Sequence, residues 1–420
     1  MTNQAFPRGA SVAVIGAGIV GVASACELAR RGYEVVVYDP EPPGEAGSSR
    51  ANAGHVAASD IHPLSTPGIH WKALKMLINP DSPLKIPLRD SVAHIPWFWR
   101  FWRTSRGKRF ETATRALSYL CGSTLTDTSA MLESAGMTGM LEHKGCAFLY
   151  DTERSFAASK RIWADKNVRG FDSEEMDAGR IASDIPSINA KFRHAVLSCQ
   201  WSQMRDPLDV VRGLARAAQS HGVIFHRGRV NSLSGGLDSV TLETGKGRSR
   251  HDAAIIAAGV NSVAFAESCG DLLPMVAERG YNLTIPAPGI ELDLPLVFAD
   301  RGIVATHLTS GLRIGGWAEY VRPDRPANQK YFKSMARISS ELFPGLNLDN
   351  ADFWMGNRPS LPDSVPVISR SSHAHRVFYN CGHGHYGLTH AATSARLLCD
   401  LVAGDGNLPE YQAYSIDRFK

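Results

Sequence analysis

The stretch from Ser11 to Asp39, SVAVIGAGIVGVASACELARRGYEVVVYD, decides the fold of this chain. It opens with a short run of apolar, mostly β-branched residues, which is typical of a strand buried on both faces of a parallel sheet. The run ends in Gly16, Gly18 and Gly21, spaced G-x-G-x-x-G, where a helix is predicted to begin. After that helix, a second apolar run ends in Asp39. This order of strand, glycine turn, helix and acidic strand end predicts a dinucleotide-binding unit.

Each of these residues suits one part of a dinucleotide. Gly16 permits the tight turn, Gly18 lets the backbone approach a pyrophosphate, and Gly21 lets the helix pack close to the strand. A carboxylate at Asp39 would bind ribose hydroxyls and repel a 2′-phosphate. The motif leaves open whether the dinucleotide is NAD or FAD, and a glycine-rich turn that serves only helix packing is the alternative.

Length and composition narrow the class of protein. The chain has 420 residues, enough for two domains, and its 44% hydrophobic and 20% charged residues are ordinary for a soluble globular protein. A net charge of +4 is too dilute to predict a nucleic-acid partner. The seven cysteines are scattered and never spaced C-x-x-C, so we expect reduced thiols and no zinc or other metal site. The N-terminal stretch lacks the layout of a signal peptide, which predicts a cytoplasmic protein.

Three further stretches suggest contacts or chemistry. Residues 44–54, GEAGSSRANAG, form a polar loop of small residues that suits either a ligand longer than NAD or an ordinary surface turn. Residues 97–103, WFWRFWR, interleave aromatic and basic side chains. They predict contact with a membrane interface or, as we favour, a helix packed over a substrate domain. Residues 358–363, RPSLPD, predict a rigid loop that carries one arginine.

The last glycine-rich turn of the chain, CGHGHYG at residues 381–387, opens an amphipathic helix that is expected to run to about Val402. Free backbone N–H groups and the positive end of the helix dipole attract an anion to such a turn. The two ends of the chain therefore each offer an anion site, and we expect both to serve one cofactor.

The chain resembles FAD-dependent amine oxidoreductases of the D-amino-acid oxidase and glycine/sarcosine oxidase superfamily. It is most similar to their D-amino-acid dehydrogenase branch, which includes D-hydroxyproline dehydrogenases. Five segments in family order carry this resemblance: VIGAGIVG at 14–21, SSRANAG at 48–54, ERGYNLTI at 278–285, GNRPSLPDSVPVI at 356–368 and GHGHYGLT at 382–389. The first is shared by many flavoproteins, whereas the second and last together are far more specific.

The resemblance implies an α/β (α+β) fold. In it, a Rossmann-like FAD-binding domain is interleaved with a smaller substrate domain built on a mixed or antiparallel sheet. The FAD-binding domain would comprise residues 1–75, 205–268 and 352–420, and the substrate domain residues 76–204 and 269–351.

The resemblance also implies that FAD is bound without a covalent link, because neither Asn52 nor Cys381 is the attachment residue of relatives with covalent flavin. Arg50 stands where the branch usually has an apolar residue, so it adds a second cation near the site or contacts a phosphate. The residues carried over for FAD are Gly16, Gly18, Gly21, Asp39, Ser49, Arg50, Asn52, Ala53, Gly54, Val230, Ala258, Gly259, Gly382, His383, Gly384, Gly387, Leu388 and Thr389.

For the substrate, Arg358 matches the family arginine that binds a carboxylate, a task that suits the planar fork of a guanidinium. A structural arginine bonded to loop carbonyls is the alternative. His385, Tyr281 and His55 are the other catalytic candidates. The last two have a second interpretation, as packed residues or contacts of the flavin wall.

The implied reaction is oxidation of the CH–NH bond of a small D-amino or imino acid, such as D-proline, hydroxy-D-proline or D-alanine. Hydride would pass from Cα to flavin N5, and the imine would be released or hydrolysed. No dedicated general base stands out in the sequence. One alternative is a glycine/sarcosine-type oxidase that makes hydrogen peroxide. Another is a flavin-carrying subunit of a heteromeric amino-acid or opine dehydrogenase. An NAD-linked dehydrogenase is the least favoured alternative.

Apart from the substrate, the sequence leaves several partners of the chain undetermined. The electron acceptor is a quinone, the respiratory chain or oxygen. The chain can form homo- or hetero-oligomers, and residues Trp97–Trp102 can attach it peripherally to the cytoplasmic face of the inner membrane.

Overall fold

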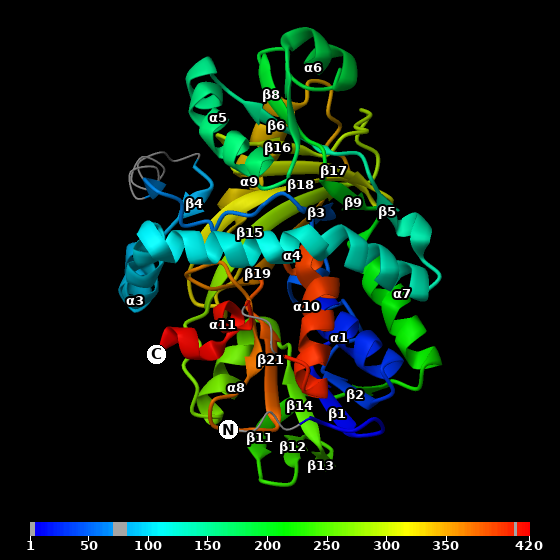
Figure 1. The fold of residues 1–420 in the computed structure, drawn as a ribbon. Helices are drawn as coiled ribbons and strands as arrows, with labels where there is room; N and C mark the ends of the chain where they lie inside the picture. The colour runs from blue at the N-terminus through cyan, green and yellow to red at the C-terminus, as the bar shows by residue number, and fades with distance from the viewer. Residues whose placement is uncertain (1–4, 70–81, 407–409) are drawn as a thin grey trace.

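The computed structural model describes residues 5–69, 82–406 and 410–420. Two large sheets organise it, one in the lower and one in the upper half of Figure 1, and the long helix α4 (Gly107–Ser134) crosses between them. Both ends of the chain lie in the lower half. The predicted mixed α/β fold is confirmed.

The lower sheet has six strands in the order β10-β2-β1-β14-β21-β20. All neighbours are parallel except β20, which runs antiparallel to β21. Buried valine, isoleucine and alanine fill the central strands, as parallel strands covered on both faces require. The strands are β1 (Ser11–Ile15), β2 (Glu34–Asp39), β10 (Ile224–Arg227), β14 (Ala253–Ile256), β20 (Val367–Arg370) and β21 (Val377–Cys381).

Helices cover one face of this sheet and a small antiparallel sheet covers the other (Figure 1). The helices are α1 (Ile19–Arg30), α7 (Pro207–Ser220) and α10 (Gly387–Ala403). The opposite face carries β11 (Val230–Gly235), β12 (Val240–Thr244), β13 (Gly247–His251) and α8 (Ser262–Ser268). Two short helices, α11 (Tyr411–Tyr414) and η4 (Ile416–Phe419), end the chain.

The upper sheet has nine strands and is mixed. Its order is β19-β15-β18-β17-β16-β6-β8-β7, with β4 beside β18. Only the pairs β16·β6 and β18·β4 are parallel. The strands are β4 (Leu84–Lys85), β6 (Cys146–Tyr150), β7 (Ser173–Met176), β8 (His194–Ser198), β15 (Val276–Ile285), β16 (Leu296–Phe298), β17 (Ile303–Leu308), β18 (Gly311–Tyr320) and β19 (Asp352–Ser360).

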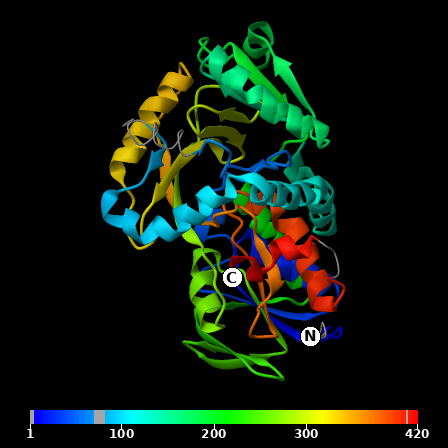
Figure 2. The same ribbon diagram turned by 60° about the vertical axis from the view of Figure 1, so that its left-hand side comes forward.

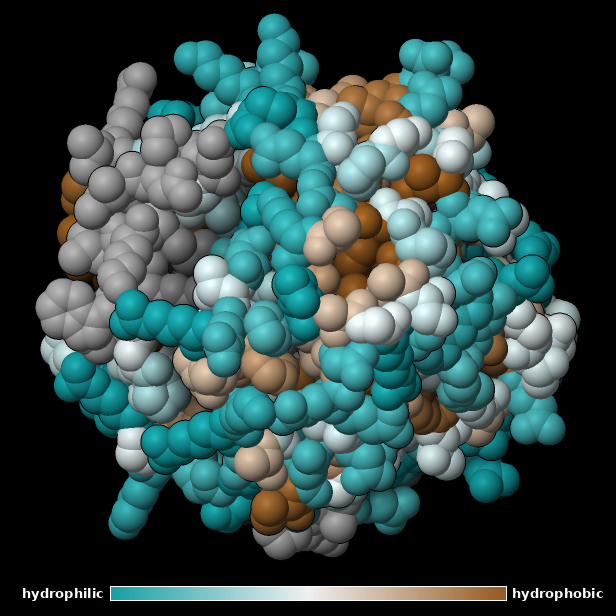
Figure 3. All heavy atoms as spheres, turned by 90° about the horizontal axis from the view of Figure 1, so that it is seen from above, coloured by the Kyte–Doolittle hydropathy of each residue, from teal (hydrophilic) through white to brown (hydrophobic). Residues whose placement is uncertain are grey.

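Helix α9 (Gln329–Leu342) packs its apolar face on the outer side of this sheet, as Figure 2 shows. Helices α5 (Glu153–Val168) and α6 (Ala178–Asp184) lie at the far end. Seen from that end, the surface is mostly hydrophilic with small scattered hydrophobic groups (Figure 3). A second three-stranded sheet joins β3 (His55–Val56), β9 (Ser202–Met204) and β5 (Leu141–Glu142).

The region predicted as a rigid loop at residues 358–363 begins as a strand instead. Arg358 and Pro359 belong to β19, where Arg358 pairs with Glu278 of β15. Proline is tolerated there because β19 is an edge strand, on which a missing N–H costs little. Arg358 is therefore held by a sheet and not by a loop.

The aromatic stretch at residues 97–103 lies on helix α3 (Leu88–Thr104), as the favoured interpretation expected. Its inner side chain Trp97 is buried and donates its indole N–H to the carbonyl of Ser360 at 3.1 Å. The outer face exposes Val92, Ile95 and Trp99. Within the described residues, no helix combines the length and apolar content needed to cross a membrane.

The domain boundaries predicted from the sequence stay a prediction. The one between residues 75 and 76 lies outside the described residues. Strand β19 pairs with the upper sheet although it follows the last predicted boundary, at 351/352.

Candidate active site

The glycine turn after β1 leaves no space for side chains. Gly16 has a φ of 114°, and a Cβ there would lie 2.4 Å from the carbonyl oxygen of Ala257. A Cβ on Gly21 would lie 1.9 Å from the carbonyl oxygen of Gly16. The turn therefore brings β1, α1 and the chain after β14 into direct backbone contact.

A cavity of about 530 Å³, called the smaller cavity below, opens at this turn. The oxygens of Asp39 in its wall accept hydrogen bonds from the backbone N–H groups of Ala17 (2.8 Å) and Glu41 (2.9 Å). Each carboxylate oxygen can accept a second bond, so ribose hydroxyls still find acceptors. The predicted cofactor residues in the wall are Gly16, Gly18, Asp39, Ser49, Asn52, Val230, Ala258, Gly259, Gly382, His383, Gly384, Gly387 and Leu388.

The loop at residues 48–52 is anchored by the upper sheet. The hydroxyl of Ser48 donates to the carbonyl oxygen of Asn357 at 2.5 Å. Asn282 donates its amide to the carbonyl of Ala51 at 2.8 Å, and Arg313 donates Nη1 to the carbonyl of Asn52 at 2.6 Å. These contacts hold the loop where the two halves of the molecule meet.

A second cavity of about 730 Å³, called the larger cavity below, lies on the other side of this loop. Both cavities share Ser48, Asn52 and Gly384 in their walls. The wall of the larger cavity is mainly apolar and aromatic. Its aromatic residues are Trp97, Phe98, Phe101, Trp102, Phe148, Trp201, Tyr281, Trp317, Tyr320, Trp354 and Tyr386.

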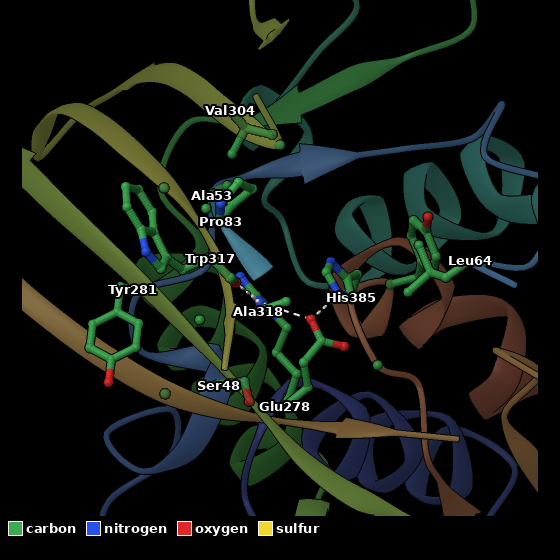
Figure 4. Close-up of a pocket in the computed structure, with 18 of the residues that line it drawn as sticks. Ser48, Ala53, Leu64, Pro83, Glu278, Tyr281, Val304, Trp317, Ala318 and His385 are labelled. Atoms are coloured by element: carbon green, nitrogen blue, oxygen red, sulfur yellow. Dashed lines mark hydrogen bonds and ion pairs between the residues drawn. The ribbon is translucent and has the colours of Figure 1, made fainter. Parts of the chain in front are cut away.

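A buried carboxylate organises the polar part of the larger cavity. Glu278 is 1% exposed, and its Oε1 lies 2.6 Å from Nε2 of His385 and 3.2 Å from Nη1 of Arg358. Its Oε2 accepts from the hydroxyls of Ser360 (2.8 Å) and Tyr320 (3.3 Å). Burial acts to raise the pKa of Glu278, but His385 and Arg358 lower it to about 2. Figure 4 shows this cluster at the wall of the cavity.

Two features of the sheet place Arg358. A Cβ on Gly280 would lie 2.1 Å from Nη2 of Arg358, so the guanidinium lies directly against the backbone of β15. The carbonyl oxygen of Trp317 accepts from Nη1 at 2.8 Å. Trp317 has a φ of 62°, an unusual backbone for a bulky residue, and lies opposite an irregularity in the pairing of β15 with β18.

The other two catalytic candidates make contacts of their own. The hydroxyl of Tyr281 donates to Glu319 at 2.6 Å and accepts from the N–H of Asn328, and its ring points away from His385 in Figure 4. Nε2 of His55 contacts the hydroxyl of Thr306, and burial lowers the pKa of His55 to about 4. Both residues line the larger cavity, and their assignment as catalytic candidates stays a prediction.

The remaining predicted cofactor residues divide into two groups. Ala53 and Thr389 line the larger cavity, and the hydroxyl of Thr389 accepts from the N–H of Ala57 at 3.0 Å. Gly21, Arg50 and Gly54 line neither cavity. Arg50 lies exposed just after the short helix η1 (Gly47–Ser49).

The two cavities fit FAD. They share three wall residues and so lie next to each other, and together they offer space for an elongated ligand. The side-chain oxygen of Asn380, which lines the smaller cavity, and that of Asn282, which lines the larger one, are buried without a hydrogen-bond partner. Unpaired acceptors of this kind are costly unless a ligand or water satisfies them. The glycine turn and helix α1 would hold the pyrophosphate.

Sequence reasoning missed Glu278. Glu278 is the first residue of the segment ERGYNLTI, which carries the family resemblance, but no role was predicted for it. A signal that could have drawn attention to it is a pair of charged residues, Glu278 and Arg279, at the start of a mostly apolar segment. Its partners Arg358 and His385 are distant in sequence, so only strand pairing brings the three together.

Comparison with known proteins shows the family to which the chain belongs. The family model for FAD dependent oxidoreductases (DAO) matches residues 11–401. A D-amino-acid oxidase of Bradyrhizobium diazoefficiens is 30% identical over 413 residues, which is 95% of this chain and 96% of that protein. A D-amino acid dehydrogenase of Sinorhizobium medicae is 31% identical over 400 residues, which is 93% of this chain and 95% of that protein.

Solved structures share the fold. Glycine oxidase from Geobacillus kaustophilus has a TM-score of 0.75 at 20% identity, covering 97% of this chain and 98% of its own. L-proline dehydrogenase from P. horikoshii has a TM-score of 0.75 at 18% identity, covering 99% and 98%. With the family match over nearly the whole chain and two adjacent cavities that suit the cofactor, the protein belongs to the DAO family of FAD-dependent oxidoreductases.

Proposed function

We propose that this FAD-dependent oxidoreductase oxidises the CH–NH bond of a D-amino or D-imino acid with an apolar side chain to an imine. The names of its relatives support an amino-acid substrate, and Arg358 at the wall of an aromatic cavity is the observation that carries the proposal. FAD, when bound, supplies the electron acceptor for this oxidation.

Arg358 is suited to hold the substrate carboxylate. Its Nη1 makes both protein contacts, to Glu278 and to the carbonyl of Trp317. Nε and Nη2 make no hydrogen bond within the described part of the chain, and together they form one edge of the guanidinium fork. A carboxylate can pair with that edge through both of its oxygens.

The rest of the larger cavity favours an apolar side chain. Among the acidic groups in its wall, Glu278 is paired as described, and Asp60 pairs with Lys166 at 3.0 Å. Arg313 donates to Thr284 and to the carbonyl of Asn52. A charged substrate side chain would meet aromatic rings and lose hydration without a new partner, which is unfavourable. D-proline, D-alanine and larger apolar D-amino acids are therefore the candidate substrates.

Arg358→Ala tests the proposal. Loss of a bidentate, charge-assisted pair costs about 3 kcal/mol, so kcat/KM should fall roughly a hundredfold while FAD content is unchanged. Arg161→Ala, on the exposed side of helix α5, is the matched control and should behave like the wild type. Unchanged KM and turnover in Arg358→Ala would refute a carboxylate-binding role.

The compound that takes the electrons from the reduced flavin decides whether the enzyme is an oxidase or a dehydrogenase. Stoichiometric hydrogen peroxide in air identifies an oxidase, whereas turnover only with a quinone or dye identifies a dehydrogenase. FAD-loaded protein that becomes active only when a second subunit is added would instead identify a component of a heteromeric complex.

We also propose a peripheral membrane contact through helix α3. Val92, Ile95 and Trp99 lie on one exposed stripe of this helix, spaced three and four residues apart. Arg103 and Arg106 follow at its C-terminal end, and the guanidinium of Arg106 lies 4.0 Å over the ring of Trp102. An apolar stripe flanked by cations suits an anionic lipid surface.

A further inference from the structure

Glu278 determines which nitrogen of His385 carries a proton. Its carboxylate is ionised and only accepts hydrogen bonds, so Nε2 of His385, 2.6 Å away, must donate to it. In the neutral ring, Nδ1 is then a free acceptor. Nδ1 makes no hydrogen bond within the described residues, and one third of the His385 side chain is exposed, at the wall of the larger cavity. Figure 4 shows the imidazole beside the carboxylate.

The amino-acid substrate of the proposed function must lose a proton from its nitrogen before it can be oxidised. A free amino acid at neutral pH is an ammonium ion, whose nitrogen has no free electron pair to stabilise the developing imine. A base beside the carboxylate-binding arginine would solve this problem. Arg358 and His385 contact the same oxygen of Glu278 and both line the larger cavity, so the guanidinium and the imidazole are neighbours in one wall of the space that would hold the substrate.

We propose that His385, oriented by Glu278, is the base that removes this proton before oxidation. The inference rests on the proposed function. An N–H bond of the substrate ammonium breaks and leaves its electron pair on the amine nitrogen. The proton bonds to Nδ1 of His385, which becomes an imidazolium, and no oxidant or further reactant takes part in this step.

The charges around His385 support the transfer. The proposed step starts from a neutral His385 ring and a zwitterionic substrate, with Glu278 and Arg358 as a pair of opposite charges. After it, the imidazolium lies against the Glu278 carboxylate and the substrate carboxylate against Arg358, so each new charge has an opposite neighbour.

The other titratable groups facing this cluster are poor bases near neutral pH. Tyr320 on β18 and Tyr386, next in sequence to His385, have pKa values raised well above the usual range by burial. Both therefore keep their protons. His55, across the cavity, has a pKa of about 4 and uses Nε2 to contact Thr306.

The pH profile of anaerobic flavin reduction in the FAD-loaded enzyme tests this role. His385→Asn should reduce the rate roughly a hundredfold near neutral pH. The deficit should shrink steadily toward about pH 10, where the amine is neutral in solution. Glu278→Gln, which removes the charge that favours the imidazolium, should shift the acid limb of the profile to lower pH. His221→Asn, on the exposed C-terminal end of helix α7, is the control and should match the wild type.

Binding of isovalerate, a carboxylate without an amine, separates a base from a structural residue. Calorimetry should give the same affinity for His385→Asn and wild type, and a weaker affinity for Arg358→Ala. The inference is overturned if His385→Asn follows the wild-type rate at every pH, or weakens isovalerate binding as much as Arg358→Ala does. If no amino acid reduces the wild-type flavin at any pH, it is the proposed function that fails.

Discussion

At the scale of single residues, the absence of a side chain at Gly280 lets Arg358 reach its position. The guanidinium occupies the space that a Cβ would fill, 2.1 Å from Nη2. Glu278 and the carbonyl of Trp317 then fix it from the opposite edge. A cation held by a sheet in this way is oriented before substrate binds, which lowers the entropic cost of recognition.

Gly280→Ala is expected to displace Arg358 without unfolding the protein, because the clash is with the end of a flexible side chain. KM for the amino acid should rise at least about tenfold, since a shifted guanidinium loses one of two hydrogen bonds to the carboxylate. FAD binding should be unchanged. Gly245→Ala, where a Cβ would meet nothing within 4 Å, is the matched control. A KM equal to that of Gly245→Ala would show that Gly280 does not position Arg358.

The sequence predicted some of these residues and not others, for a physical reason. Arg358, His385 and Glu278 all lie within segments shared with the family, but the resemblance implies a role only for the first two. Glu278 acts through two partners far along the chain, and nothing local marks a glutamate as the counter-ion of a distant arginine. Tyr281 lies near these residues in the same segment, but strand alternation directs its hydroxyl to Glu319 on the other side.

At the scale of elements, helix α3 has two apolar faces with different surroundings. Trp97, Phe98 and Phe101 line the larger cavity, while Val92, Ile95 and Trp99 face outward. One helix thus lines the cavity proposed for the substrate and carries the stripe proposed for membrane contact. A lipid-soluble acceptor bound to a membrane at this surface would lie close to the cavity.

Removing the outer stripe should abolish membrane contact. The triple variant Val92→Ser, Ile95→Ser, Trp99→Ser is expected to lose co-sedimentation with phosphatidylglycerol vesicles that the wild type shows at low salt, with flavin reduction unaffected. Leu237→Ser is the control, because Leu237 is an apolar residue outside helix α3 that is even more exposed than the three residues of the stripe. Equal sedimentation of wild type and triple variant, or none for either, would contradict the proposed contact.

Strand β19 shows why element type is hard to predict near proline. Two prolines, Pro359 and Pro362, favoured a loop over residues 358–363. The strand forms because its position at the sheet edge needs few of its N–H groups. That position follows from pairing with β15, which local sequence does not reveal.

At the scale of the whole molecule, burial of several histidines links stability to pH. Burial lowers the pKa of His55 to about 4, of His383 to about 3 and of His390 to about 4. In the unfolded chain these rings titrate near 6.5. The unfolded state therefore binds more protons below that pH, and stability must fall with decreasing pH.

The melting temperature of the apoprotein should thus be level above about pH 6.5 and fall steeply between about pH 6 and 4. Each of the three histidines contributes a slope of up to about 1.4 kcal/mol per pH unit. His390→Asn should reduce the slope, whereas His221→Asn, at an exposed helix end, should not. A melting temperature independent of pH across this interval would contradict the burial of neutral histidines.

The two large sheets differ in how much of their strand arrangement could be predicted from the sequence. In the lower half, β1, α1 and β2 are consecutive in the chain and follow the pattern predicted for residues 11–39, although the sheet also takes strands from two later segments. The upper sheet joins strands from both sides of the middle FAD-binding segment. Its order depends on long-range pairing, for which hydrophobic pattern alone is insufficient.

The central claim is that this flavoprotein oxidises a D-amino or D-imino acid held by Arg358. Anaerobic mixing of the FAD-loaded protein with matched enantiomers of proline, alanine and phenylalanine, followed by flavin absorbance, tests it most directly. The account predicts that D-enantiomers bleach the flavin band while L-enantiomers leave it unchanged, and that Arg358→Ala is bleached far more slowly. Bleaching by L-enantiomers alone, or by none of these compounds at any pH, would contradict it.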